Sequence, residues 1–171
     1  MGKSQPRIIV ADASVLVNFL KVDRVDLLSQ FPATFMVSDH VAEEITIHDN
    51  EQCQRFQNAL ANEILVQESL TSFEEVKLFG ELTTKGRLGY GECAAIAIAI
   101  RREYQLAIDD RRARNEALRK LGTLNIFRTQ DLIVEMIQAN LLDVAEADSI
   151  KTTWSNQHRF HLKFSSFADL L

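Results

Sequence analysis

The stretch Arg7–Asp12, with the sequence RIIVAD, is a short apolar run that contains β-branched residues and ends in a carboxylate. A run of this kind is typical of a buried strand in a parallel sheet. A second such run, QLAI over Gln105–Ile108, ends in the pair Asp109–Asp110. Open α/β sheets bind their ligands at the carboxyl ends of strands, so these carboxylates are expected to line one crevice.

The rest of the chain alternates predicted strands with predicted helices. Strands are expected at residues 8–11, 34–37, 63–67, 106–108 and 124–127, and helical spacing of apolar residues follows most of them. The form of Thr71–Glu74 resembles a capping box, which predicts a helix after it. Helical segments are also expected near residues 144–154 and 166–171. This alternation predicts an α/β fold with a central parallel sheet of about five strands between helical layers.

Two more acidic residues stand at expected helix starts. Glu44 lies in the helix that Ser38 should cap, and Glu92 follows a glycine-rich loop and opens the most apolar helix, Cys93–Ile100. Carboxylates gathered in one place repel one another and need a hard cation to stay ionised. Oxygen-only ligation suits Mg²⁺ or Mn²⁺. Taken singly, Asp12, Glu92 and Asp109–Asp110 are equally explained as a helix cap, a first-turn charge or a turn, and Glu44 is better explained as a first-turn or surface glutamate.

The bulk properties predict one ordinary cytoplasmic domain. The chain has 171 residues, of which 46% are hydrophobic and 25% charged, so residues 1–171 are expected to form a single domain. No signal peptide or membrane-spanning segment is evident, and Cys53 and Cys93 lack the spacing of a metal or redox motif. Cys93 is expected to be a small core residue rather than a nucleophile.

The net charge of -5 argues against binding of nucleic acid through bulk positive potential. It leaves room for a local site that holds phosphates through metal and a few arginines. Arg111 and Arg112 directly follow Asp109–Asp110 and are predicted to contact substrate. The alternative for these two arginines is a solvated helix face.

Four segments carry a family resemblance when they are read in order. They are VADASVLVN at Val10–Asn18, VAEEI at Val41–Ile45, LGYGECAAIA at Leu88–Ala97 and IDDRRAR at Ile108–Arg114. Their order and spacing resemble the four acidic motifs of PIN-domain nucleases across residues 7–130, and they are similar to the VapC-like proteins of toxin–antitoxin systems. The last motif has Ile108 where many members carry Thr or Ser, and the helical segment 143–171 extends beyond the minimal domain.

The resemblance implies a three-layer α/β/α PIN-like fold and an Mg²⁺- or Mn²⁺-dependent endoribonuclease. Such an enzyme hydrolyses RNA phosphodiester bonds through a metal-activated water and leaves 5′-phosphate and 3′-hydroxyl ends. Carried over by motif, the catalytic metal ligands are Asp12, Glu44, Glu92 and Asp110. Glu44 matches the second motif better than Glu43 does. Asp109 is a further candidate ligand that the sequence does not separate firmly from Asp110. Ser14 would orient Asp12 or touch a phosphate.

The resemblance also implies partners. The protein would be the toxin of a toxin–antitoxin pair, restrained by a small antitoxin protein, and would form a homodimer. One alternative is a non-catalytic PIN-like module that binds RNA or protein, which predicts gaps in the acidic set. A receiver-type phosphoryl acceptor is a third hypothesis, disfavoured because it needs a lysine late in the sheet, whereas Lys120 falls in a predicted helix.

Overall fold

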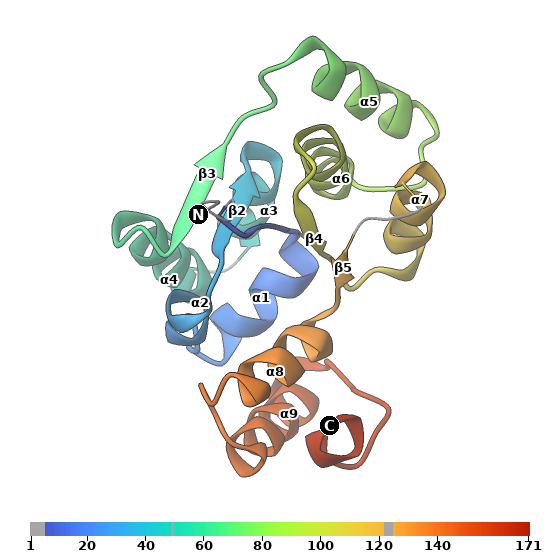
Figure 1. The fold of residues 1–171 in the computed structure, drawn as a ribbon. Helices are drawn as coiled ribbons and strands as arrows, with labels where there is room; N and C mark the ends of the chain where they lie inside the picture. Colours follow the sequence, from blue (N-terminus) through green and yellow to red (C-terminus); the bar gives the residue numbers. More distant parts are fainter. Residues whose placement is uncertain (1–5, 49, 122–124) are drawn as a thin grey trace, which may run out of the picture.

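The structure is a computed structural model that describes residues 6–48, 50–121 and 125–171. Within these ranges one sheet has the strand order β3-β2-β1-β4-β5, and every neighbouring pair is parallel (Figure 1). The strands are β1 (Ile8–Ala11), β2 (Thr34–Ser38), β3 (Leu65–Glu68), β4 (Gln105–Ala107) and β5 (Ile126–Phe127). The predicted five-stranded parallel sheet is therefore confirmed.

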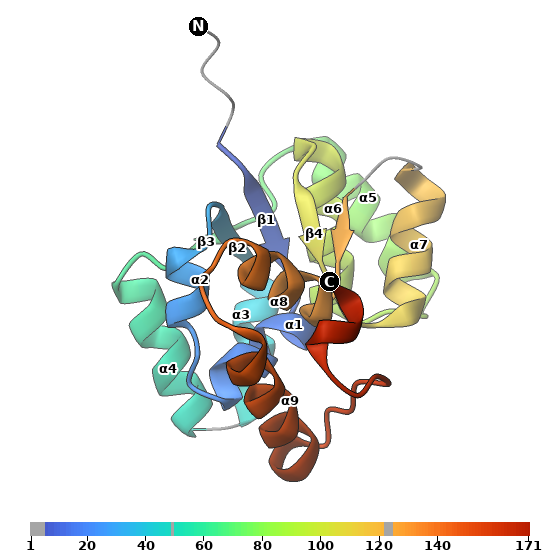
Figure 2. The ribbon, with the colours of Figure 1, turned by 60° about the horizontal axis from the view of Figure 1, so that its bottom comes forward.

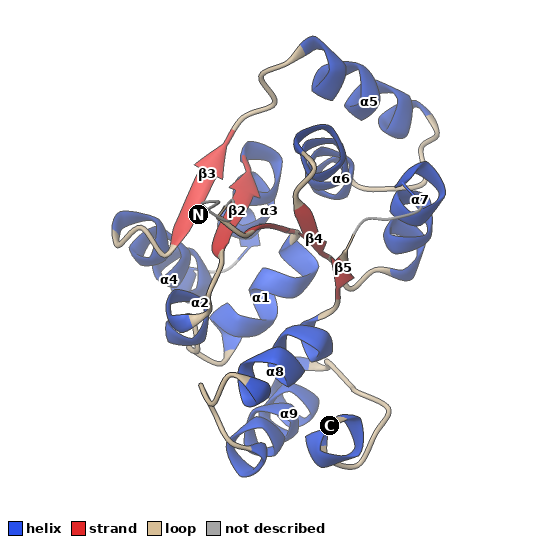
Figure 3. Ribbon diagram, viewed as in Figure 1, coloured by secondary structure: helices blue, strands red, loops and turns tan. Residues whose placement is uncertain are grey.

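Helices fill the connections between the strands and the C-terminal part of the chain (Figure 3). They are α1 (Ala13–Lys21), α2 (Asp26–Gln30), α3 (Asp39–His48), α4 (Asn50–Ala61), α5 (Phe73–Thr84), α6 (Tyr90–Arg102), α7 (Arg111–Leu121), α8 (Thr129–Gln138), α9 (Val144–His158) and the 3₁₀ helix η1 (Phe167–Leu170).

The strands place alternate side chains in two separate buried clusters, because successive side chains of a strand point to opposite faces. Ile9 of β1 packs with residues of α1, α4 and α8, whereas Val10 packs with residues of α5, α6 and α7. Figures 1 and 3 show helices on both sides of the sheet. The three-layer α/β/α architecture is confirmed.

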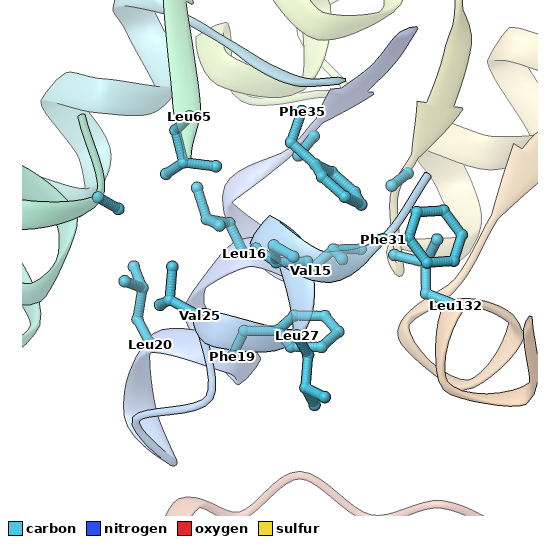
Figure 4. Packing of buried hydrophobic residues seen from close by; sticks show 14 of the residues in the cluster. Val15, Leu16, Phe19, Leu20, Val25, Leu27, Phe31, Phe35, Leu65 and Leu132 are labelled. Atoms are coloured by element: carbon cyan, nitrogen blue, oxygen red, sulfur yellow. The ribbon is translucent and has the colours of Figure 1, made fainter. Parts of the chain in front are cut away.

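The larger of the two buried clusters is the one that contains Ile9, and α1 lies at its centre. Figure 4 shows its side chains, including Leu16 and Phe19 of α1, turned toward residues of β2, β3 and α8. On the other face, the run Cys93–Ala99 of α6 is completely buried, as its apolar sequence predicted. Both faces of β1 are therefore covered, and only the ends of the sheet remain available for chemistry.

The C-terminal helices pack on the same cluster as α1. Trp154 of α9 is fully buried, meets Phe19 at a ring-centroid distance of 6.4 Å, and donates a hydrogen bond from Nε1 to the carbonyl oxygen of Asn18 at 2.8 Å. Figure 2 shows α8 in front of α1 with α9 below them. Of the C-terminal aromatic residues, Trp154 and Phe167 are both fully buried.

Some boundaries differ from the sequence predictions. The polar residues 50–54 belong to α4, which keeps one face exposed. The capping box of α5 is formed by Ser72 and Glu75, one residue later than predicted. The described part of the fifth strand is Ile126–Phe127, and the predicted start at Leu124 lies outside the described residues. Among the described helices, none is both long and apolar enough to span a bilayer.

Candidate active site

Asp12 stands at the carboxyl end of the central strand. Its backbone N–H donates to the carbonyl of Ala107 at 2.9 Å, and its side chain caps α1 by accepting hydrogen bonds at Oδ2 from the N–H (3.0 Å) and the hydroxyl of Ser14. Asp12 is 2% exposed, and its buried Oδ1 has no hydrogen-bond partner among the described residues. Burial raises the pKa of Asp12, and the nearby charge of Asp110 raises that pKa further.

Glu44 and Glu92 meet at the N-terminus of α6. The N–H of Gly91 donates to Glu44 Oε1 at 3.0 Å, and the N–H of Gly89 donates to Glu92 Oε2 at 2.9 Å. The free N–H groups and the dipole at a helix start favour negative charge. A Cβ atom on Gly91 would lie only 2.5 Å from Glu44 Oε1, so Glu44 can reach this helix only because residue 91 is glycine.

The carboxylates act on one another electrostatically. Partial burial raises the pKa of Glu44, and the charge of Asp12 adds to that rise. Partial burial also raises the pKa of Glu92, with further contributions from Asp12, Asp110 and Glu44. The acidic residues that follow β1, β2 and β4 and that open α6 are thus close enough to influence one another electrostatically. They lie near the switch point of the sheet, where β2 and β4 pair with opposite edges of β1.

Asp109 and Asp110 have different surroundings. Asp110 accepts a hydrogen bond at Oδ1 from the N–H of Ala113 at 2.9 Å, at the start of α7. Asp109 uses both oxygens: Oδ1 accepts from the N–H of Thr129 at 2.8 Å, and Oδ2 accepts from the Thr129 hydroxyl at 2.6 Å and from Asn18 Nδ2 at 3.1 Å. Asp109 therefore ties α1 to α8, while burial raises its pKa.

Four of the candidate carboxylates share one arrangement. In each, one oxygen accepts hydrogen bonds from N–H or O–H groups, and the other accepts none from the described residues: Asp12, Glu44, Glu92 and Asp110. No described lysine or arginine forms an ion pair with any of the four. Their all-oxygen donor set fits Mg²⁺ or Mn²⁺. In the described ranges, however, no three acidic, histidine or cysteine side chains are already gathered closely enough to enclose an ion.

The remaining predicted residues lie around this region. The Ser14 hydroxyl donates to Asp12 and accepts from the N–H of Asp109 at 3.1 Å, so it links the ends of β1 and β4. Arg111 and Arg112 are exposed in the first turn of α7. Cys93 is buried in the core, as predicted, and burial raises the pKa of its thiol to about 11, so it is no thiolate nucleophile at neutral pH.

Two contributors were not singled out from the sequence. Asn18 Nδ2 lies 3.0 Å from both the carbonyl oxygen of Ser14 and the hydroxyl of Thr129, in addition to its contact with Asp109. The signal for Asn18 was a polar residue one helical turn after Ser14 in an otherwise apolar helix. The signal for Gly91 was a glycine inside the first turn of a predicted helix, where it weakens the helix unless close approach requires it.

Comparison with known proteins gives a family match. The PIN-domain family DUF3368 matches residues 8–152. No curated protein matches the sequence.

Several solved structures are similar to the chain. A PilT N-terminus domain protein from the archaeon Sulfolobus solfataricus P2 is 16% identical, with a TM-score of 0.49, over 77% of this chain and 94% of that one. VapBC2 from Rickettsia felis, solved bound to a DNA fragment from its promoter, is 16% identical with a TM-score of 0.48, over 71% of this chain and 98% of that one. PAE2754 from Pyrobaculum aerophilum is 13% identical, with a TM-score of 0.49, over 78% of this chain and 99% of that one. Because the family match at residues 8–152 spans most of the chain, the protein belongs to the PIN-domain family DUF3368.

Proposed function

We propose that the protein is a divalent-metal-dependent endoribonuclease. The observation that carries this proposal is the set of four carboxylates, each with one oxygen held by hydrogen bonds and one oxygen that accepts none from the described residues. Four such anions facing one region are costly unless a cation joins them. A non-catalytic module would have no reason to keep the whole set, and the set is complete.

The metal would be held by Asp12, Glu44, Glu92 and Asp110. When bound, a divalent ion supplies an acidified water and neutralises charge on phosphoryl oxygens. We assign Asp109 a positioning role instead, because both of its oxygens are occupied by Thr129 and Asn18.

The protein's own groups fix the carboxylates before any ligand arrives. Ser14 holds Asp12 through two hydrogen bonds, and the N-terminus of α6 holds Glu44 and Glu92. The Asn18 side chain donates hydrogen bonds to Thr129, at the start of α8, and to Asp109, and the Asn18 carbonyl accepts one from Trp154. Preorganisation of this kind keeps charged groups in place for the transition state instead of reorganising them during the reaction.

Within this proposal the protein acts as a homodimeric toxin restrained by an antitoxin. The support is the sequence likeness to VapC-like motifs, together with four carboxylates that form no ion pair with a described lysine or arginine. A cationic side chain from a partner would be attracted to these carboxylates. Induced expression of the wild-type chain should arrest bacterial growth, whereas expression of Asp12→Asn should not; equal growth of the two strains would remove the toxin assignment.

Cleavage of a mixed RNA pool, with Mn²⁺ present or absent, tests the nuclease proposal. Asp12→Asn and Glu44→Gln should lower the rate by about 100-fold or more, since a lost ligand removes several kcal/mol of charge stabilisation. Glu43→Gln is the matched control, because Glu43 is the exposed neighbour of Glu44 on α3. It should cut like the wild type. Unchanged cleavage by Asp12→Asn would overturn the proposal.

A further inference from the structure

A cavity of about 380 Å³ lies between the α5–α6 connection and α7. Leu88 lines it and directly precedes Gly89, whose N–H holds Glu92. Arg112 lines it from the other side and stands two residues after Asp110. Figure 1 shows this connection passing beside α7. The cavity is therefore built on the same two chain segments that carry Glu92 and Asp110.

The charge of the cavity is opposite to that of the carboxylates. Glu116 pairs there with Lys85 at 2.5 Å and with Arg119 at 3.6 Å, and the bond from Lys85 lowers the pKa of Glu116. Arg87 and Arg112 also line the cavity, and neither has an ion pair or hydrogen bond to another described residue. In the described part of the chain, four cations and one carboxylate thus line the cavity, and two of the guanidinium groups have no partner there.

The cavity is not simply a basic surface, because part of its lining is apolar. Leu82 is 1% exposed and Leu88 is half-buried, and both contribute to the wall. An apolar wall with a guanidinium rim suits a ligand that carries a flat apolar ring and an anion on one molecule. A guanidinium offers two parallel N–H donors to phosphate oxygens, and a cavity of this size is in the range of small-ligand sites.

We propose that this cavity is a nucleotide subsite: it takes one nucleotide of the RNA next to the phosphodiester that reaches the carboxylates. The base lies against Leu82 and Leu88, and Arg87 and Arg112 bind a phosphate. The placement beside the scissile bond rests on the proposed nuclease function, whereas the binding itself does not. With a net charge of -5, the chain needs such local contacts to hold a polyanion.

Binding is tested without divalent ion, so that cleavage plays no part. A 5′-labelled single-stranded RNA octamer is titrated with wild-type protein in EDTA, and affinity is read by fluorescence anisotropy at several salt concentrations. Arg87→Ala and Arg112→Ala should each weaken binding about tenfold and reduce the salt slope by about 0.7, the value for one phosphate contact on a single strand. Arg101→Ala is the matched control, an exposed arginine at the opposite end of α6. It should bind like the wild type.

Competition identifies the ligand class. Adenosine monophosphate should displace the octamer at a concentration at least tenfold lower than inorganic phosphate does, and Leu88→Ser should erase that difference. The subsite is overturned if Arg87→Ala and Arg112→Ala bind like Arg101→Ala. It is also overturned if inorganic phosphate or polyglutamate competes as well as the nucleotide. If the wild type binds as predicted but never cuts RNA, the nuclease proposal fails while the subsite stands.

Discussion

Asp109 and Asp110 are neighbours in the sequence but have different hydrogen-bond partners in the fold. Leu106 and Ile108 pack toward α6 and α7, whereas Ala107 packs with α1 and α8. The observed hydrogen bonds follow the same division: Asp110 bonds to the start of α7, whereas Asp109 bonds to α1 and α8. The sequence alone did not separate the two aspartates, because β4 ends at Ala107, before either residue. The acceptor role of Asp109 could not be predicted, because Asn18 lies 91 residues away and meets it only in the fold.

Substitution of the two aspartates should have different effects. Asp109→Asn replaces an acceptor oxygen by an amide donor that faces Thr129 and Asn18, so the free energy of unfolding should fall by about 1–3 kcal/mol. Asp110→Asn keeps the Ala113 cap and should leave the unfolding midpoint nearly unchanged while abolishing cleavage. Thermal denaturation and initial cleavage rates report the two effects. Equal stability loss in both variants, with cleavage retained in Asp110→Asn, would reverse the assignment.

At the scale of elements, the start of α6 organises the acidic region. Gly89 and Gly91 hold Glu92 and Glu44 by backbone N–H groups, and Glu44 arrives from α3. The sequence predicted the helix and the glycine-rich loop before it, because apolar runs and glycines are local signals. The approach of α3 to α6 depends on packing between distant segments, so the bond from Gly91 to Glu44 was not predictable.

Gly91→Ala should displace Glu44 without breaking the helix. The new Cβ would lie 2.5 Å from Glu44 Oε1, so the carboxylate must move. Cleavage should fall at least about tenfold, while alanine otherwise favours a helix by roughly 0.5–1 kcal/mol. Gly80→Ala on α5 is the control, because nothing lies within 4 Å of its Cβ position. It should raise stability and leave cleavage intact. Full activity in Gly91→Ala would show that cleavage does not require the Glu44 carboxylate at its position beside residue 91.

The pair Glu75–Arg102 joins α5 to α6. Arg102 Nε donates to Glu75 Oε1 at 2.7 Å, and the side-chain hydrogen bonds from Arg102 lower the pKa of Glu75 to about 2 from its usual 4.5. A depressed carboxyl pKa contributes stability that is fully present above the unfolded value and lost as pH falls toward the folded value. The contribution of Glu75 should therefore disappear between about pH 4.5 and pH 2.

Urea denaturation of Glu75→Gln tests this linkage. At pH 7 the substitution should lower the free energy of unfolding by about 3 kcal/mol, because it breaks a buried ion pair. The difference from the wild type should shrink steadily below pH 4.5 as Glu75 becomes protonated in the unfolded chain. Glu74→Gln is the matched control, since Glu74 is exposed and lies 4.0 Å from Arg101. A difference that stays constant down to pH 2.5 would contradict the linkage.

At the scale of the whole molecule, the C-terminal helices α8 and α9 are linked to the acidic region through α1. Trp154 donates a hydrogen bond to the backbone of Asn18, and the Asn18 side chain donates to Asp109 and Thr129. The Asn18 side chain also donates to the carbonyl of Ser14, whose hydroxyl donates to Asp12. The sequence predicted helices in this segment. It did not reveal which helix they cover, because that depends on contacts between residues 136 positions apart. We propose that residues 143–171 belong to the same cooperative unit as the acidic motifs.

Divalent-ion binding by the metal-free protein tests the central claim most directly. Burial and neighbouring charges raise the pKa of Asp12, so its ionised form destabilises the metal-free fold, and Asp12→Asn should raise the unfolding midpoint. Saturating Mn²⁺ should stabilise the wild type by about 2.7 kcal/mol at one hundred times the dissociation constant, a shift of roughly 5–10 °C, and should leave Asp12→Asn unmoved. The account is contradicted if Mn²⁺ does not raise the unfolding midpoint of the wild type, or if it raises that of Asp12→Asn by the same amount.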